Sequence, residues 1–167
     1  MKSQAKTTAF LGLCVSLALV LAYVETLVPP IVSIAPGIKM GLPNLIIIFI
    51  LYKRGIGSAV AVSFFRILLV SILFGNFMSL AYSLAGGFLS LVVMIILKKF
   101  DFLSQIGVSV AGGVAHNLGQ ILMAMLLLNT KELGYYMIVL TVTGIISGAV
   151  VGFGGYFLIK KVKLNVR

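Results

Sequence analysis

Seven polar or charged side chains lie within or beside the long apolar stretches of this sequence, and their types could do chemistry: Glu25, Lys39, Asn44, Arg66, His116, Asn117 and Gln120. An ionised group at the centre of a bilayer costs at least roughly 2.5 to 3.5 kcal/mol, so it needs a partner, a hydrated cavity or a route to the interface. His116 and Gln120 are four residues apart and share one helical face. Cations, amides and an imidazole set against one carboxylate favour a ligand that carries negative charge.

Each of these residues also has a purely structural interpretation. Glu25 and Arg66 could form a buried ion pair that only locks two helices together, and the histidine and its neighbouring amides could hydrogen-bond adjacent helices. Lys39 could extend to the lipid headgroups. These alternatives stay open at the level of sequence. A binding site is favoured because five elements place polar groups at one depth.

Membrane helices are the elements that must position these residues. Three stretches, residues 67–97, 102–130 and 133–159, contain no charged residue, and about 20 apolar residues cross the roughly 30 Å of hydrocarbon in a bilayer. The chain is 61% hydrophobic and 10% charged, too apolar to stay in water. We expect one all-α integral membrane domain over residues 1–167. Its six helices are expected at 8–27, 41–52, 56–74, 77–97, 106–128 and 135–159.

The cations give the orientation of these helices. Most lysines and arginines precede the first expected helix, follow the second or the fourth, or close the chain, whereas Lys39 and Lys131 fall in the other loops. By the positive-inside rule, both termini are then cytoplasmic. The net charge of +10 is explained by this orientation and by anionic headgroups, so no nucleic acid is expected as a partner. The first apolar run loosely fits a secretory signal, but we interpret it as a retained helix.

The second expected helix is too short to cross a bilayer unaided, because about twelve residues at 1.5 Å each span under roughly 20 Å. Residues 28–40 before it are apolar but hold three prolines and a glycine, which stop an ordinary helix. We expect a re-entrant loop in the outer leaflet. It leads to a helix with Pro43 in its first turn, whose N-terminus faces a cavity as an anion or polar-group site. The alternative is a helix start capped by its own loop, with nothing bound.

Small residues at helical spacing predict close helix packing. Gly144, Gly148 and Gly152 are each four residues apart in the last expected helix, and such faces let backbones approach closely in lipid. Packing within the chain is an adequate explanation for them. Cys14 is the only cysteine, which excludes an internal disulfide or a thiolate metal cluster. No metal or other cofactor is expected.

Four segments carry a resemblance to a known family: residues 36–44 (PGIKMGLPN), 66–70 (RILLV), 83–87 (SLAGG) and 115–120 (AHNLGQ). Over nearly its whole length the chain resembles the Gx transporter superfamily, the six-helix substrate-binding S components of energy-coupling factor importers. It is most similar to the branch labelled heptaprenyl diphosphate synthase component I. The resemblance implies a multi-pass protein of the bacterial plasma membrane.

The resemblance also implies partners and a pocket. S components bind a small-molecule substrate from outside and hand it inward by toppling in the membrane. They dock on a transmembrane coupling subunit through a small-residue face of helix 1, and a pair of ATPases supplies the energy. By position, Ala18 and Ala22 match that docking face. The matching polar residues become the candidates for the substrate pocket, with Glu25 as the nearby carboxylate: Lys39, Asn44, Arg66, His116, Asn117 and Gln120.

The name of this branch raises an enzymatic interpretation, which the residues do not support. Joining allylic diphosphates needs Mg²⁺ held by clustered carboxylates, whereas this chain has one aspartate, Asp101, and no P-loop motif. Since a catalytic triad is lacking too, we expect no catalytic residues. The favoured function is a subunit that captures a small, anionic or polar molecule for ATP-driven uptake. The alternatives are a subunit that binds a prenyl or quinone-like lipid for isoprenoid metabolism or flavin-based electron transfer, and a purely structural scaffold.

Overall fold

The computed structural model describes residues 2–27 and 41–162, and no strand occurs in these ranges. Five of the helices are long and apolar enough to cross a membrane, judged by length and composition. The chain is therefore an all-helical protein with the segments of a multi-pass membrane protein. In chain order its elements are α1 (Lys2–Leu27), α2 (Asn44–Lys53), α3 (Ile56–Phe74), α4 (Phe77–Phe100), α5 (Gln105–Leu128), the 3-10 helix η1 (Lys131–Tyr136) and α6 (Met137–Lys161).

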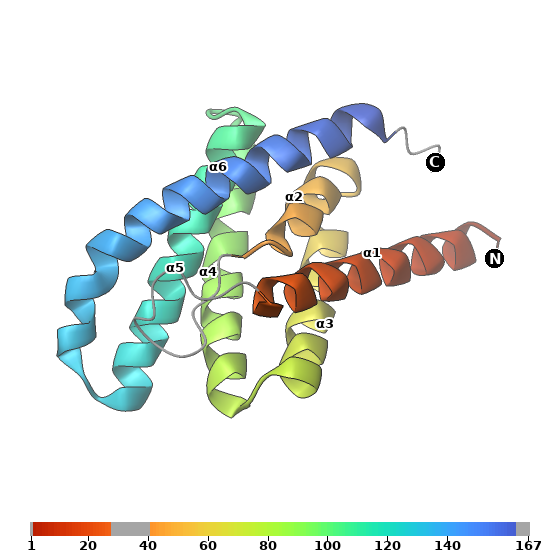
Figure 1. Ribbon diagram of the computed structural model, residues 1–167. Coiled ribbons are helices and arrows are strands. Elements are labelled where there is room, and N and C mark those ends of the chain that lie inside the picture. The colour runs from red at the N-terminus through yellow and green to blue at the C-terminus, as the bar shows by residue number, and fades with distance from the viewer. Residues whose placement is uncertain (1, 28–40, 163–167) are drawn as a thin grey trace.

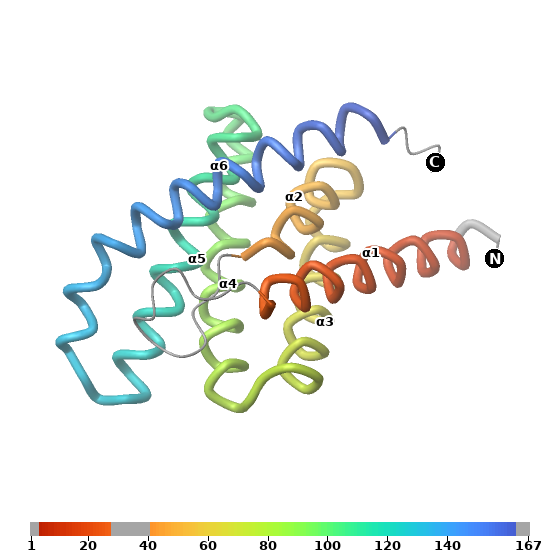
Figure 2. Tube along the Cα trace, viewed as in Figure 1, coloured from red at the N-terminus to blue at the C-terminus, as the bar shows by residue number. Residues whose placement is uncertain are grey.

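Helix α5 is the centre of the bundle, because it packs extensively against both α4 and α6. Figure 1 shows α3, α4 and α5 running alongside one another, with α6 crossing them obliquely. Helix α1 packs mainly on α3, and α2 contacts α6 and α3. The tube in Figure 2 shows that the start of α1 extends beyond the other helices. Helix α1 is thus the long helix with the least cover from the rest of the protein.

Glycines bring α5 and α6 into backbone contact. A Cβ atom added at Gly113 would lie 2.5 Å from the carbonyl oxygen of Gly144, and one at Gly148 would lie 2.7 Å from the Cα atom of Val110. Backbone atoms cannot move aside as a flexible side chain can, so only glycine permits this separation. The expectation that the small residues of the last helix pack within the chain is confirmed.

Helix α2 is short and lies in the core. Its ten residues reach about 15 Å, and the run of residues 46–51 (IIIFIL) is buried all round. A helix that is apolar on every face is suited to such a position. Its C-terminal end is held by cations, since Lys98 Nζ donates to the carbonyl oxygen of Leu51 at 2.5 Å and Arg54 donates to the Thr7 hydroxyl at 2.8 Å. The predicted short second helix is therefore present.

Several helix boundaries differ from those expected. The third helix occupies the predicted residues, whereas α1 begins at Lys2 instead of residue 8, and α4 continues to Phe100. Helix α2 begins at Asn44, three residues later than expected, because residues 42 and 43 form a turn before it. The 3-10 helix η1 was not expected. The predicted re-entrant loop, residues 28–40, and with it Lys39, lies outside the described residues.

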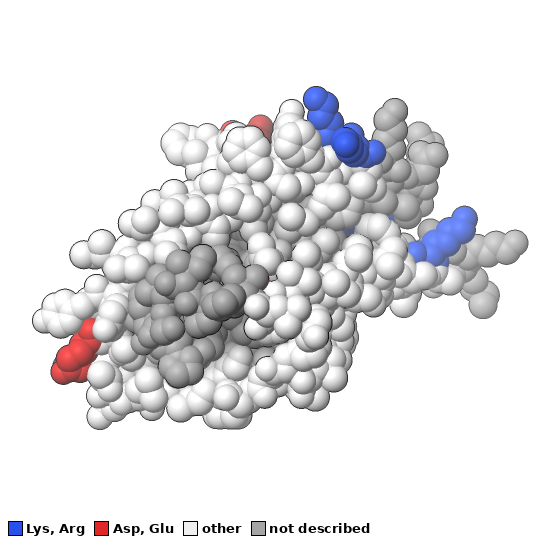
Figure 3. All heavy atoms as spheres, viewed as in Figure 1, with Lys and Arg blue, Asp and Glu red and all other residues white. Residues whose placement is uncertain are grey.

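Basic residues gather toward one end of the bundle. Figure 3 shows lysine and arginine atoms where α1 begins and α6 ends, whereas acidic atoms occur both beside η1 at the far end and on the same side as the end of α6; Asp101 directly follows the lysines of the last turn of α4. Lysines also occupy the last turns of α2, α4 and α6, while Glu132 lies in the first turn of η1. The surface in between is mostly uncharged and exposes many large apolar side chains, as contact with lipid requires.

Candidate binding site

A small polar cavity lies where α1, α3, α4 and α5 meet the turn before α2. We call it the Arg66 cavity. The centres of water molecules can occupy a volume of about 20 Å³ in it, which is enough for one or two waters. Four of the residues predicted from sequence line it, one each from α1 and α3 and two from α5. Its described lining is Ala22, Glu25, Gly41, Pro43, Arg66, Ile67, Val70, Ser83, His116 and Gln120.

Arg66 is buried and has two neighbours among the predicted residues. Its Nη2 atom donates to the Asn44 side-chain oxygen at 3.3 Å, so Asn44 joins the site from the first residue of α2. The Glu25 carboxylate attracts the guanidinium electrostatically. The Nε atom of Arg66 is buried and has no hydrogen-bond partner in the described part of the chain. One donor of the cation therefore remains for another molecule.

The Glu25 side chain links α1 to the turn before α2 through a hydrogen bond. Its carboxylate accepts a hydrogen bond of 2.5 Å from the backbone N–H of Gly41. Gly41 has a φ of +85°, a conformation that glycine adopts without strain and other residues rarely take. The glycine of the GLPN segment thus lets the chain turn so that its N–H faces a carboxylate. Part of the polar-group site expected at the start of the second helix is occupied by the protein itself.

His116 and Gln120 project from one turn of α5 toward α4, as their spacing predicts. Both side chains are buried, and Gln120 is only 1% exposed. Within residues 2–27 and 41–162, neither the amide nitrogen nor the amide oxygen of Gln120 has a hydrogen-bond partner. His116 Nδ1 lies against the backbone of Gly86 but forms no hydrogen bond of good geometry. This turn therefore presents unpaired polar atoms to the cavity.

Asn117 does not line the Arg66 cavity. Its Nδ2 atom donates to the carbonyl oxygen of Leu140 at 2.8 Å and approaches the Thr143 hydroxyl at 3.3 Å. Both partners belong to α6. In this conformation Asn117 takes the interhelical role that was the structural alternative for it.

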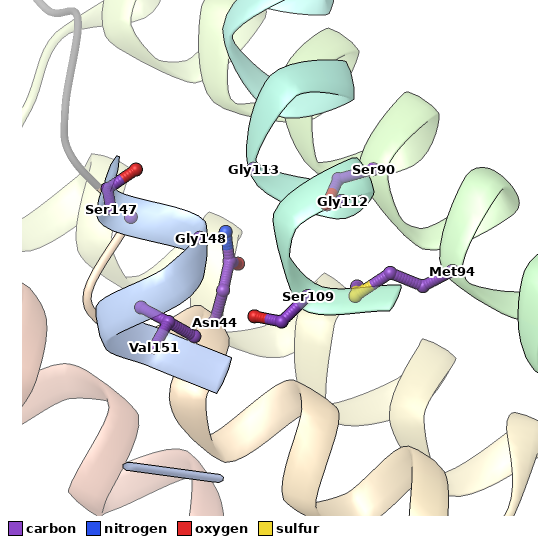
Figure 4. A pocket seen from close by; sticks show the side chains of 10 residues that line it. Asn44, Ser90, Met94, Ser109, Gly112, Gly113, Ser147, Gly148 and Val151 are labelled. Carbon is purple, nitrogen blue, oxygen red and sulfur yellow. The ribbon is translucent and has the colours of Figure 1, made fainter. Parts of the chain in front are cut away.

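A second cavity, which we call the Ser90 cavity, was not anticipated from sequence. The centres of water molecules can occupy about 10 Å³ there. The cavity is lined by glycines and serines of α4, α5 and α6, by Met94 and Val151, and by Gly41 and Asn44. Figure 4 shows the Asn44 side chain between the ribbons of α5 and α6, with Ser109 pointing toward it. Ser90 Oγ is buried without a partner. The sequence signal for this cavity is weak, because its glycines, such as Gly112 and Gly113, serve close packing of the helices and no side-chain pattern reveals the space beside them.

Ala18 and Ala22, predicted to dock a coupling subunit, face the interior of the chain. They are 0% and 1% exposed, Ala18 lies in the apolar core, and Ala22 lines the Arg66 cavity. A docking face must be accessible, so in this conformation the two alanines pack against the protein's own helices. A different set of small residues is exposed along α1: Ala5, Ala9, Gly12 and Ser16.

The described residues contain no group of three or more histidines, cysteines or acidic residues that could hold a metal ion. The polar groups of the Arg66 cavity are one guanidinium, one carboxylate, one imidazole, an amide and a serine hydroxyl. Such a set suits hydrogen bonding and charge recognition. It offers no cluster of hard oxygen ligands of the kind that Mg²⁺ needs.

Comparison with known proteins identifies the family. The model of the family described as heptaprenyl diphosphate synthase component I matches residues 14–158, most of the chain, and the chain belongs to this family. The family is the branch of the Gx transporter superfamily that the sequence motifs indicated. Comparisons with curated proteins and with solved structures give no match.

Proposed function

We propose that this chain is a substrate-binding subunit, like the S components, for ATP-driven uptake of a small anionic or polar molecule across the cell membrane. The observation that carries the proposal is the Arg66 cavity, where buried polar groups of α1, α3 and α5 converge in a bundle of membrane-length helices. The energy would come from ATPases in trans. The chain itself would bind and release, with no catalytic residue.

The contrast between Asn117 and Gln120 supports a binding site over a purely structural lock. The two amides are three residues apart on α5 and equally inaccessible to solvent. Asn117 is paired across the α5–α6 interface, as interhelical hydrogen bonding requires, whereas both ends of the Gln120 amide lack a partner. A buried polar group without a partner costs about 1 to 3 kcal/mol. A ligand that pairs with Gln120 would recover that cost.

A ligand larger than water needs the Arg66 cavity to widen. Helix α1 is the element best placed to move, because it has the least cover among the long helices and contributes Ala22 and Glu25 to the cavity. Near the cavity its carboxylate is joined to the Gly41 N–H. We propose a closed state, described here, in equilibrium with an open state in which α1 shifts relative to α3. A ligand that binds the open state better would increase its population.

The proposed orientation has both termini in the cytoplasm. Its support is the gathering of lysines and arginines at the end where α1 begins and α6 ends, according to the positive-inside rule. Cysteine labelling tests it: in a Cys14→Ala background, Lys99→Cys should react with an impermeant maleimide only after cells are opened. Lys131→Cys should react in intact cells. The reverse pattern would refute the orientation.

Docking on a coupling subunit is proposed through the exposed small-residue face of α1. Ala5, Ala9, Gly12 and Ser16 recur at helical spacing and are all exposed, and a Cβ atom at Gly12 would meet no other atom within 4 Å. Small residues let a partner helix approach closely in lipid. This face replaces Ala18 and Ala22 in the proposal, because those two alanines are inaccessible.

Native mass spectrometry of the gently purified protein tests the binding function. The wild type should retain a small polar molecule, and Arg66→Gln should lose it. Asn117→Ala is the matched control, since Asn117 is buried on the same bundle but does not line the cavity; it should keep the molecule. Circular dichroism checks that each variant is folded. A bound mass that Arg66→Gln and Asn117→Ala retain equally would contradict the assignment of the site.

A second function is favoured by the name of the family, which refers to heptaprenyl diphosphate synthesis. In this alternative the chain is a membrane subunit that binds a prenyl or quinone-like lipid. The Arg66 cavity holds only one or two waters, so a long prenyl chain would have to widen it further than a small polar molecule would. A polyprenyl species in the mass spectrum of the purified protein would favour this alternative.

A further inference from the structure

The amide of Gln120 is a buried polar group in the lining of the Arg66 cavity. It is 1% exposed, lines the cavity and has no hydrogen-bond partner at either end among the described residues. Its position depends on Gly86 of α4, because a Cβ atom there would lie 2.7 Å from Gln120 Cγ and equally close to the His116 carbonyl oxygen. The glycine thus makes room for an amide that the fold leaves unpaired.

The chemistry of an amide defines what pairs with it best. The group presents an N–H donor and a C=O acceptor side by side in one plane. A partner that matches both has its own N–H and C=O on one edge, as in a lactam, a ureide or a cyclic imide. The match does not depend on which way the Gln120 amide is flipped, because a ligand with an N–H and a C=O on one edge can bind in the correspondingly flipped orientation. A carboxylate edge offers acceptors only and would leave the amide oxygen facing a lone pair.

The charges of the cavity agree with a neutral edge. Arg66 and Glu25 both line the cavity and attract each other, so these two buried groups balance formally. Moreover, Arg66 Nε is an unpaired donor in the same cavity. A carbonyl oxygen on the ligand has two lone pairs and can accept from a second donor. Such an edge brings no additional charge into the bilayer interior, where charge is costly.

We propose that the ligand of the Arg66 cavity carries a planar edge with adjacent N–H and C=O groups, and that the Gln120 amide binds this edge with two hydrogen bonds. The proposal rests on the proposed binding function and narrows it to a chemical class: small cyclic amides, ureides or imides. A simple carboxylate or phosphate falls outside that class. Other parts of the ligand can still contact Arg66 and Asn44.

Three probes test the edge directly on the full-length protein in detergent micelles: uracil, 1,3-dimethyluracil and benzoate. Uracil has the N–H and C=O edge, its dimethyl derivative has the same ring with both N–H groups blocked, and benzoate has a carboxylate only. Isothermal calorimetry and thermal-shift titration give the dissociation constants. We expect uracil to bind about tenfold or more tightly than either of the other two, as two hydrogen bonds imply.

Substitution of the glutamine completes the test. Gln120→Met keeps the length of the side chain and removes both hydrogen-bonding groups, so the preference for uracil over dimethyluracil should disappear. Gln120→Leu serves the same purpose should the Met variant fail to fold. Gln105→Met is the matched control, because Gln105 begins the same helix and does not line either cavity; the preference should remain unchanged.

Three results of these titrations would overturn the inference: equal binding of uracil and dimethyluracil, failure of uracil to bind, or an unchanged preference in Gln120→Met. None of them decides the proposed uptake function, which is judged by the co-purified molecule and its loss in Arg66→Gln. A co-purified polar molecule that lacks an N–H/C=O edge would support that function and overturn this inference.

Discussion

Gly119→Ala is the substitution whose effect the structure fixes most closely. A Cβ atom at Gly119 would lie 2.7 Å from the carbonyl oxygen of Ala85 and 2.8 Å from the Cα atom of Gly86. Ordinary contacts of a Cβ atom begin near 3.4 Å, so the backbones of α4 and α5 would have to separate by about 0.7 Å. Overpacking of this kind costs about 1 to 3 kcal/mol, and the better helix propensity of alanine returns up to about 1 kcal/mol.

With the full return of about 1 kcal/mol, the net prediction is a loss of up to about 2 kcal/mol in the free energy of unfolding. Gly57→Ala is the control, because that glycine lies in α3 and a Cβ atom there would meet nothing within 4 Å; it should be neutral or slightly stabilising. Reversible unfolding in mixed micelles, followed by circular dichroism, measures both variants. If Gly119→Ala were as stable as Gly57→Ala, the backbone contact between α4 and α5 would be wrong.

The same substitution should also weaken ligand binding. Gly119 precedes Gln120 directly, and its neighbour Gly86 adjoins both Gln120 and His116. A separation of α4 from α5 at this point would therefore displace the unpaired amide. Binding of the co-purified molecule should fall in Gly119→Ala and stay unchanged in Gly57→Ala. Equal binding by the two variants would show that the α4–α5 contact does not position the site.

Three further substitutions separate packing, charge and docking. Asn117→Ala should lower stability by about 0.6 kcal/mol, the average for an interhelical hydrogen bond in a membrane, with ligand content unchanged in native mass spectra. Glu25→Leu leaves the buried Arg66 without its nearby carboxylate and should lower the free energy of unfolding by about 3 to 5 kcal/mol. The double variant Glu25→Leu/Arg66→Leu removes both charges and should recover much of this loss in the same unfolding assay. Gly12→Leu should reduce co-purification with a coupling subunit while ligand binding persists, and normal assembly would exclude this face of α1.

Much of the fold is encoded in length and hydropathy. A helix that crosses a membrane must be long, apolar and bounded by polar or turn-forming residues, so the ends of α3 could be assigned to the residue. The short α2 was also predictable, because the prolines before it limit its length. Helix ends near the lysines were harder to predict, since lysines extend α1 and α4 without disturbing the helical backbone.

The partners of the site residues could be predicted only in part. Spacing showed that His116 and Gln120 share a face, and the structure puts both against α4. Spacing could not show that Asn117, the residue after His116, faces α6 instead. Consecutive residues point about 100° apart around the helix axis, and which helix lies in each direction depends on the packing of the bundle. The inward orientation of Ala18 depends likewise on where α1 meets α3. The Ser90 cavity is lined mostly by glycines and serines, residues that also occur in ordinary helix packing, and it therefore has almost no sequence signature.

The unequal packing of the bundle is what makes a buried polar site compatible with a stable fold. Unpaired groups such as the Gln120 amide and Arg66 Nε each cost of the order of 1 to 3 kcal/mol, and the glycine contacts among α4, α5 and α6 supply close packing on that side. Helix α1 lies on the other side, with little cover. We therefore propose that a ligand opens the site by displacing α1, which separates Glu25 from the Gly41 N–H, and that it gains the unpaired groups as partners. In this proposal the rigid half of the site lies on α5 and the movable half on α1.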